Sequence, residues 1–352
     1  MKRLDQIEPR TPIDSLPYTI EESGSYYVTG NLRFSGTNMA CGICIEASDV
    51  TLDLGGFVLD GDREGEAAIR ATNTLTNITV RNGIMRNWQF TGVDLPANGC
   101  HLADLTVVGT GDDSGGFLCG DNALLTRCVS RDHIQGGFRV GQNCILENCQ
   151  AFDSGYGGFF IGNGTLVKEC IAAGNRYWTG VQGGDQCEIR GSLFLRNGFY
   201  GVEVGRGSKV VDCLVASNSY DGIYAQSNSI VQGCHISDNG SGGIVAFGGS
   251  RVLMNELRAN LRFDDTAVGE ITIGGSNCLV QDNHVVVAVG AGILVQGGYT
   301  NETSRAQFTN NVIVKNIVFG GGANNYVYPI GNDVGPIGNA ATFGSPWSNI
   351  SH

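Results

Sequence analysis

The side chains best placed to do chemistry are two aspartates, Asp132 and Asp153, which are 21 residues apart. The chain repeats with about that period, so we expect both to hold the same turn of neighbouring backbone coils, with their carboxylates ~5 Å apart. Such a pair suits retaining glycoside cleavage, a shared calcium ion or one acid with a raised pKa. Asp113, His133 and Arg139 fall close to this pair and complete the candidate catalytic set.

Two interpretations of these aspartates stand side by side. In a hydrolase, one of the acids would protonate the oxygen of the leaving sugar. The alternative is structural, because aspartate is favoured in turns, where its carboxylate bonds to the backbone two residues further on.

A second candidate is a ridge of aromatic side chains in successive turns. Partly exposed rings at regular intervals form a platform for the apolar faces of sugars. Alternatively, the rings shield glycine-rich turns, or they contact another subunit. The candidate substrate-binding residues are Tyr156, Tyr177, Trp178, Tyr200, Tyr220, Tyr224, Gln182 and Glu203, with Phe199 in the same ridge.

Metal binding is not confidently assigned to any residue. Cys41 and Cys44 form a Cys-x-x-Cys pair, but no second pair follows at the spacing of a zinc site. No cofactor is therefore assigned, and a calcium ion shared by the paired aspartates stays open. Most of the 12 cysteines are expected to be buried free thiols, although a bridge between Cys128 and Cys149 would be within reach.

Composition narrows the possible partners. The chain has 352 residues, 54 of them glycine, and a net charge of −12. An acidic surface repels nucleic acid and anionic membrane, so neither is expected as a partner. No apolar stretch is long enough for a membrane span. No leader is visible after Met1, and an extracellular or cell-surface location would be favoured if one had been removed.

The elements that position these residues follow from a strict repeat. A glycine followed by a bulky apolar residue recurs every 21 or 22 residues, from Gly116-Phe117 to Gly243-Ile244. Looser copies, such as Glu270-Ile271, extend the series. A second column, in phase with the first, holds small polar or thiol side chains, each three residues after an apolar one. Its members are Cys128, Cys149, Cys170, Ser192, Cys213, Cys234, Asn255, Asn283 and Asn311.

Each repeat reads as three short strands separated by Gly, Asn and Asp. Strands this short, three to a turn of 21 or 22 residues, predict an all-β fold: a single-stranded right-handed parallel β-helix (solenoid) of about twelve coils. N- and C-terminal caps would cover the exposed end strands. We therefore expect one structural domain, with a cap and irregular coil at 1–40, the β-helix at 41–316 and a terminal cap or tail at 317–352.

The coil pattern resembles the pectin-lyase-like superfamily, and more closely the bacterial right-handed parallel β-helix repeat proteins. The opening Ile-Glu-Pro-Arg-Thr-Pro-Ile-Asp-Ser-Leu-Pro-Tyr-Thr-Ile and the closing Ser-Pro-Trp-Ser-Asn-Ile resemble the ends of such proteins. The resemblance implies a substrate lying along the outside of the first strand and the turn before it. It also implies that Arg139 would serve a lyase as proton acceptor or charge neutraliser.

From these observations we expect a carbohydrate-active protein that holds a polysaccharide or oligosaccharide along an outer groove. Lyase and hydrolase activity both stay open. The rival hypothesis is a non-catalytic glycan-binding module, or a structural surface or tailspike-like protein. The pattern leaves a monomer and a homotrimer undecided.

Overall fold

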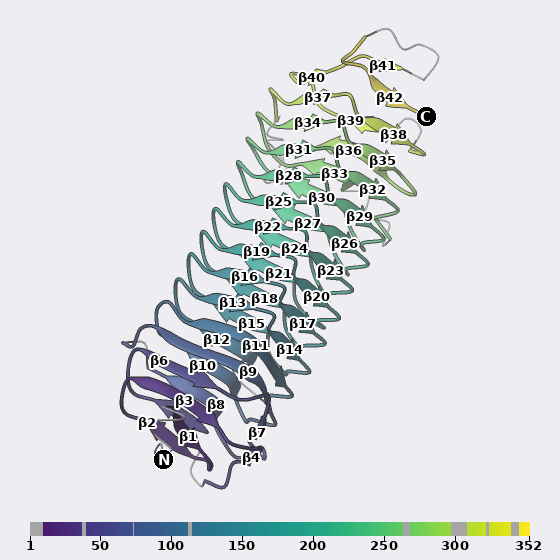
Figure 1. The fold of residues 1–352 in the computed structure, drawn as a ribbon. Coiled ribbons are helices and arrows are strands. Elements are labelled where there is room, and N and C mark those ends of the chain that lie inside the picture. Colours follow the sequence, from purple (N-terminus) through teal and green to yellow (C-terminus); the bar gives the residue numbers. More distant parts are fainter. Residues whose placement is uncertain are drawn as a thin grey trace, which may run out of the picture. The chain divides into compact units, whose positions relative to one another are not determined.

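A computed structural model describes residues 10–36, 40–72, 74–111, 115–262, 268–296, 308–321, 324–338 and 345–352. These residues contain no α-helix, and the chain forms a parallel β-solenoid of about 13 turns (Figure 1). The predicted fold class and repeat are confirmed. The chain divides into two compact units, Met1–Arg176 and Tyr177–His352, which we call unit 1 and unit 2. The boundaries predicted for the caps and the central helix stay predictions.

A regular coil of unit 1 shows how the repeat builds the fold. The coil that follows Gly137 consists of β15 (Phe138–Val140), β16 (Ile145–Glu147) and β17 (Gln150–Phe152). Each strand is three residues long and buries its middle residue or its two ends. Pairing with the next coil is parallel and in a register of 21 residues, as in Phe138 opposite Phe159. Identical positions of successive coils therefore stack on one another.

In unit 1 the first strands of the coils pair in chain order, and the second and third strands do the same. In two early coils the second and third strands merge into long strands. The first strands, besides β15, are β2 (Tyr18–Ile20), β5 (Ile43–Ile45), β8 (Ala67–Ala71), β10 (Thr91–Leu95), β12 (Gly115–Cys119) and β18 (Phe159–Ile161). The others are β1 (Thr11–Ile13), β3 (Gly24–Val28), β4 (Leu32–Arg33), β6 (Val50–Asp53), β7 (Val58–Asp60), β9 (Ile78–Arg86), β11 (His101–Val108), β13 (Leu124–Thr126), β14 (Val129–Arg131), β19 (Leu166–Lys168) and β20 (Ile171–Ala173).

Unit 2 follows the same plan. Its first strands are β21 (Val181–Gly183), β24 (Val202–Val204), β27 (Ile223–Ala225), β30 (Ile244–Ala246), β33 (Gly269–Ile273), β36 (Ala291–Val295) and β39 (Tyr326–Val327). The second and third strands, and those of the last coil, are β22 (Glu188–Arg190), β23 (Leu193–Leu195), β25 (Lys209–Val211), β26 (Leu214–Ala216), β28 (Ile230–Gln232), β29 (His235–Ser237), β31 (Arg251–Leu253), β32 (Glu256–Arg258), β34 (Leu279–Gln281), β35 (His284–Val286), β37 (Val312–Val314), β38 (Ile317–Phe319), β40 (Asp333–Val334), β41 (Ile337–Gly338) and β42 (Asn349–Ser351).

The core is made of stacked side chains inside the coils. Phe117, Phe138 and Phe159 form a column in unit 1, with ring centroids 4.8 and 5.0 Å apart and nearly parallel planes. All three rings are at most 1% exposed. Offset stacking of this kind adds to the free energy gained by burying the rings.

The cysteines are core residues, as predicted. Ten of the 12 are buried free thiols, including Cys128 and Cys149, so the bridge considered for that pair does not form. Successive sulfurs instead bond to the backbone, and Cys170 Sγ accepts from Cys149 N at 3.4 Å. The remaining two, Cys41 and Cys44, form a disulfide.

An asparagine ladder runs inside unit 2. The backbone N and Nδ2 of each asparagine both donate to Oδ1 of the asparagine in the next coil, for example from Asn218 to Asn239 at 3.0 Å. The ladder ends where the side chain of Glu270 takes the place of the next amide. Its members are Asn197, Asn218, Asn239 and Asn260, all at most 1% exposed.

A second ladder corrects one assignment made from the repeat. Asn255 bonds to Asn283, as predicted, but Asn283 bonds to Asn316 and not to Asn311. Asn311 lies in a different column, where its Oδ1 accepts from Cys278 N at 2.8 Å. The coil spacing lengthens to 33 residues at this point, and both columns carry asparagine. The assignment from residue type therefore chose the wrong asparagine.

Candidate functional site

The paired aspartates occupy one turn position in two successive coils of unit 1. Asp132 follows β14 and Asp153 follows β17, and both are exposed. Both have a left-handed backbone, with φ of 62° and 49°. The next coil carries Gly174 there, and the corresponding unit 2 turns carry Arg196, Ser217, Asp238 and Ala259, all with positive φ. The position demands a left-handed conformation, which aspartate tolerates better than most residues, and it does not demand a charge.

The surroundings of the two carboxylates differ. Asp132 Oδ2 lies 3.6 Å from Nη1 of Arg131, an exposed ion pair. The Asp153 carboxylate instead leans towards the following coil, where it fills the space next to Gly174. The structure therefore places both acids in one column, as expected, with different neighbours.

His133 does not join the exposed aspartates. Its side chain is 3% exposed and points into the coil, where Nδ1 lies 2.7 Å from Thr110 Oγ1 and accepts from Thr110 N at 3.2 Å. Burial lowers the pKa of His133 to about 3, so the ring is neutral at physiological pH. Because Nδ1 accepts a hydrogen bond, the proton belongs on Nε2, which has no partner in the described structure.

The other two members of the predicted catalytic set are also separate from the pair. Arg139 projects from the outer face of β15, with its guanidinium 5.5 Å from the centre of the Phe160 ring. Within the described residues it forms no ion pair with either aspartate. Asp113 lies outside the described residues. The structure thus brings Asp132 and Asp153 into one column but does not assemble them with His133 and Arg139.

The aromatic ridge, in contrast, is a continuous cluster in unit 2. The Phe199 ring contacts Trp178 at 5.5 Å, Tyr200 at 4.2 Å and Tyr220 at 4.4 Å between centroids. Tyr200 stacks on Tyr224 at 5.1 Å with an interplanar angle of 13°. The rings pack on one another and still leave surface for a ligand. Tyr220 is 49% exposed, and Tyr177, beside Trp178 in sequence, is 69% exposed. Tyr156 is 46% exposed in unit 1.

A row of polar side chains accompanies the rings on the outer face of the first strands. Gln182 on β21, Glu203 on β24 and Tyr224 on β27 are neighbours in register. Trp178 Nε1 donates to Gln182 Oε1 at 3.4 Å, and Gln182 Nε2 donates to Glu203 Oε2 at 3.1 Å. The amide therefore fixes the carboxylate relative to the indole. We call this part of unit 2 the Glu203 face. It consists of Trp178, Phe199, Tyr200, Tyr220, Tyr224, Gln182 and Glu203.

Burial shifts the protonation of this face. It raises the pKa of Glu203, against the opposing effect of the Gln182 hydrogen bond. It also raises the pKa of Tyr200 and Tyr224, and the negative charges of Asp221 and Glu203 add to both shifts. The tyrosines are therefore neutral hydroxyls, able to donate and accept hydrogen bonds. A half-buried acid with a raised pKa in a cluster of rings is typical of functional sites.

Two further residues, which lie beside the Glu203 face, were not among the predicted site residues. Asp221 is 7% exposed, and its Oδ1 accepts from Gly242 N at 2.7 Å. Asp221 could have been predicted from its position, because it comes immediately before the repeat glycine Gly222, where a neighbouring coil has Tyr200. Phe247 contacts Tyr224 at 5.2 Å. It follows its strand by one residue, outside the turn positions that predicted the ridge.

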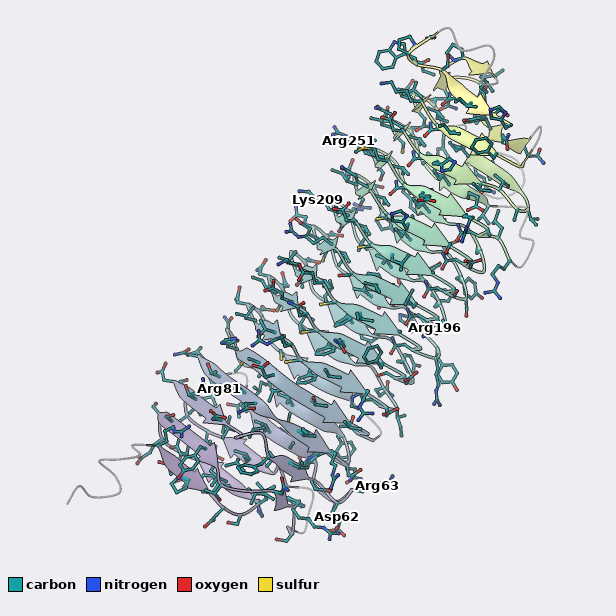
Figure 2. All side chains as sticks on the ribbon, turned by 45° about the vertical axis from the view of Figure 1, so that its right-hand side comes forward. Asp62, Arg63, Arg81, Arg196, Lys209 and Arg251 are labelled. Carbon is teal, nitrogen blue, oxygen red and sulfur yellow. A yellow bond between two sulfur atoms is a disulfide. The ribbon has the colours of Figure 1, made fainter. Side chains whose placement is uncertain are left out.

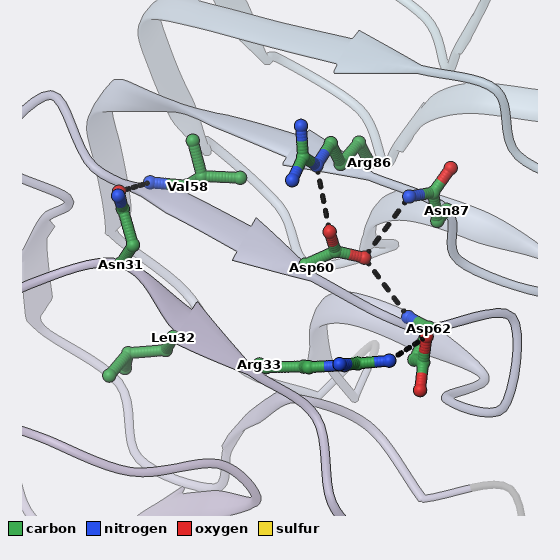
Figure 3. Close-up of a pocket in the computed structure, with 8 residues that line it drawn as sticks. All are labelled: Asn31, Leu32, Arg33, Val58, Asp60, Asp62, Arg86 and Asn87. Atoms are coloured by element: carbon green, nitrogen blue, oxygen red, sulfur yellow. Dashed lines mark hydrogen bonds and ion pairs between the residues drawn. The ribbon is translucent and has the colours of Figure 1, made fainter.

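A separate pocket of about 540 Å³ lies in unit 1 near β4, β7 and the end of β9 (Figure 3). Both aspartates in this pocket are hydrogen-bonded to an arginine. Asp60 accepts from Arg86 Nε at 2.8 Å, and Asp62 accepts from Arg33 at 2.6 Å. Burial would raise the pKa of Asp60, but hydrogen bonds from Asn87, Asp62 N and Arg86 outweigh it and lower that pKa. The Asp60 carboxylate is therefore ionised and paired with Arg86, so it is not a proton donor.

Within the described residues no three histidine, cysteine or acidic side chains are grouped to hold a metal ion. None of these residues lies in a helix with the length and apolar character needed to cross a membrane.

Comparisons with known proteins agree with the fold. Residues 177–330 match the family model described as "Right handed beta helix region". The match covers less than half of the chain, and it agrees with the right-handed parallel β-helix fold. No curated protein matches the sequence.

Among solved structures, the A-module of the mannuronan C-5 epimerase AlgE6 from Azotobacter vinelandii superposes with a TM-score of 0.55, at 15% identity, over 94% of this chain and 91% of that one. The AlgE4 A-module from the same organism gives 0.53, at 15% identity over the same shares. A tailspike protein of E. coli bacteriophage HK620, solved with a pentasaccharide, gives 0.47, at 10% identity over 94% and 72%. At these identities the likeness shows the fold alone.

Proposed function

We propose that this protein binds a polysaccharide or oligosaccharide along the Glu203 face of unit 2. The observation that carries the proposal is the continuous contact of rings from Trp178 to Tyr224 beside hydrogen-bonded Gln182 and Glu203. Sugars offer apolar faces to aromatic rings and hydroxyl groups to polar side chains, so a site that combines both suits them. Two structural neighbours are named as mannuronan epimerases, which supports a polysaccharide as the class of ligand but not its charge.

Binding can be tested with a glycan array, followed by calorimetry on the oligosaccharides that bind. Trp178→Ala should weaken binding at least about 5-fold, since stacking of a large ring contributes about 1–3 kcal/mol. Trp347→Ala is the matched control, because Trp347 is 56% exposed and contacts Lys315 rather than the Glu203 face. Equal loss in both variants, or no loss in either, would count against this location.

Catalysis is the finer part of the proposal. Polysaccharide lyase and glycoside hydrolase activity, with Asp132, Asp153, Asp113, His133 and Arg139 as the catalytic set, stay predictions. New reducing ends would report hydrolysis, and ultraviolet absorbance from unsaturated products would report elimination. Both assays belong in the same glycan screen, with and without calcium.

A non-catalytic glycan-binding or tailspike-like role is the second candidate. The observation that favours it is that the described members of the predicted catalytic set do not form one cluster, whereas the aromatic rings do. These members are Asp132, Asp153, His133 and Arg139. Binding without turnover in every assay would support this role. Light scattering would separate a monomer from a homotrimer.

A further inference from the structure

We propose that the Glu203 face selects an uncharged sugar chain and rejects uronate chains, with Glu203 as the residue that determines this specificity. The inference rests on the proposed glycan binding and names the class of glycan. Glu203 stands between Gln182 and Tyr224 in register on the outer face of the first strands. Its Oε2 accepts from Gln182, and within the described structure its Oε1 has no protein partner.

Two acids at other outward positions of this chain pair with a neighbouring cation. Asp94 holds the position in its unit 1 coil that corresponds to Glu203, and its Oδ2 lies 3.4 Å from Arg70 Nε. Asp104 pairs with Arg127 at 2.7 Å in the same way. In the described structure Glu203 has no such cation. An outward carboxylate with a free oxygen and no counter-ion is poised to accept hydrogen bonds from a ligand.

The charge around Glu203 is negative. Asp221 and Glu203 both act electrostatically on Tyr200 and Tyr224, and no basic side chain contributes to the pKa of Glu203 or Tyr224. Two basic side chains of unit 2, Lys209 and Arg251, extend from the second strands β25 and β31 and not from the first strands (Figure 2). A uronate carboxylate placed beside Glu203 would meet a like charge.

A neutral sugar satisfies the same groups. One of its hydroxyls can donate to Glu203 Oε1, while the Tyr200 and Tyr224 hydroxyls can donate to or accept from others. The exposed rings of Tyr177 and Tyr220 remain available to the apolar sugar faces. Hydrogen bonds to a charged acceptor are stronger than those between neutral groups, so Glu203 should contribute more than either tyrosine hydroxyl.

Calorimetry on the full chain tests the inference with two matched panels. One panel holds neutral gluco-, xylo- and manno-oligosaccharides, and the other holds oligouronates of similar length, each with EDTA and with calcium. We expect at least one neutral oligosaccharide to bind and every oligouronate to bind at least 10-fold more weakly in both conditions. Glu203→Gln should lower affinity for the neutral ligand about 10-fold or more. Glu188→Gln, at a half-buried acid on β22 that pairs with Arg190, should leave it unchanged.

The outcomes separate the two proposals. Oligouronates that bind as well as neutral sugars, or that bind once calcium is added, would overturn the inference while leaving glycan binding in place. Unchanged affinity in a folded Glu203→Gln variant would also overturn it. If neither panel binds, the proposed function fails and the inference fails with it.

Discussion

Glu270 accepts two hydrogen bonds from Asn260, one from the backbone N to Oε1 at 3.0 Å and one from Nδ2 to Oε2 at 2.6 Å. Both side chains are at most 1% exposed. The carboxyl thus ends the asparagine ladder inside unit 2. Burial raises the pKa of Glu270 to about 7, although the two hydrogen bonds from Asn260 act in the opposite direction.

This buried acid should make the stability of the protein depend on pH. Because the folded-state pKa is raised above its ordinary value of 4.5, the stabilising contribution is fully present below about pH 4.5 and is lost as pH rises through about 7. Between pH 5 and 8, wild type should lose about 2–3 kcal/mol relative to Glu270→Gln, which cannot ionise. Urea denaturation of both proteins at several pH values measures the difference in their free energies of unfolding. If this difference did not change with pH, the prediction would be contradicted.

Interrupting the asparagine ladder should be costly. Asn218→Ala removes the acceptor of both Asn197 donors and the donor to Asn239 Oδ1, so several buried polar groups lose partners. Each unsatisfied group costs about 1–3 kcal/mol, and we expect a total loss of about 3 kcal/mol or more. Gln232→Ala, on the outer face of β28, is the control and should cost less than about 1 kcal/mol. Similar melting of the two variants would show that the ladder is not a main source of stability.

The phenylalanine column of unit 1 is expected to be equally sensitive. Phe138→Ala should destabilise the protein by about 3–5 kcal/mol, because it leaves a cavity between two stacked rings. Phe160→Ala removes the same number of atoms from the outer face of β18 and should cost much less. Phe138→Asp, which buries an unpaired charge, should abolish cooperative folding. Thermal denaturation followed by circular dichroism measures all three, and a cooperatively melting Phe138→Asp protein would refute the inward placement of this residue.

Asparagine substitutions separate the structural and catalytic interpretations of the aspartate pair. Asp132→Asn and Asp153→Asn keep a residue that accepts the left-handed backbone, so the free energy of unfolding should change by less than about 0.5 kcal/mol. The catalytic interpretation predicts that turnover of a cleaved glycan falls at least about 100-fold. Asp238→Asn, at the same turn position in unit 2, is the control. Equal turnover in all three variants would remove the pair from the catalytic set.

The sequence predicted the fold well because a solenoid repeats its constraints. Gly137-Phe138 and Gly158-Phe159 report the same inward position one coil apart, so each copy tests the other. The failure at Asn311 shows the limit of this argument. Two inward columns both carried asparagine, and a longer coil between them removed the spacing that would have told them apart.

The candidate site was less predictable, since period assigns a residue to a position without fixing the direction of its side chain. Asp132 and His133 are adjacent in sequence, yet one is exposed and the other is 3% exposed. The aromatic ridge was easier to predict, because large rings in consecutive turns contact one another in most side-chain orientations. Asp221 and Phe247 were not predicted, because their contacts depend on the directions of neighbouring side chains, which the repeat does not specify.

The asparagine ladder also has an electrical direction. From Asn197 to Asn260 every side-chain amide donates towards the next coil, so the amide dipoles align head to tail, like peptide groups along a helix. The positive end of this array points at the carboxyl of Glu270. The aligned dipoles therefore favour a negative charge on Glu270, whereas burial in the low-dielectric core disfavours that charge. The ionisation of Glu270 is thus balanced between them near neutral pH.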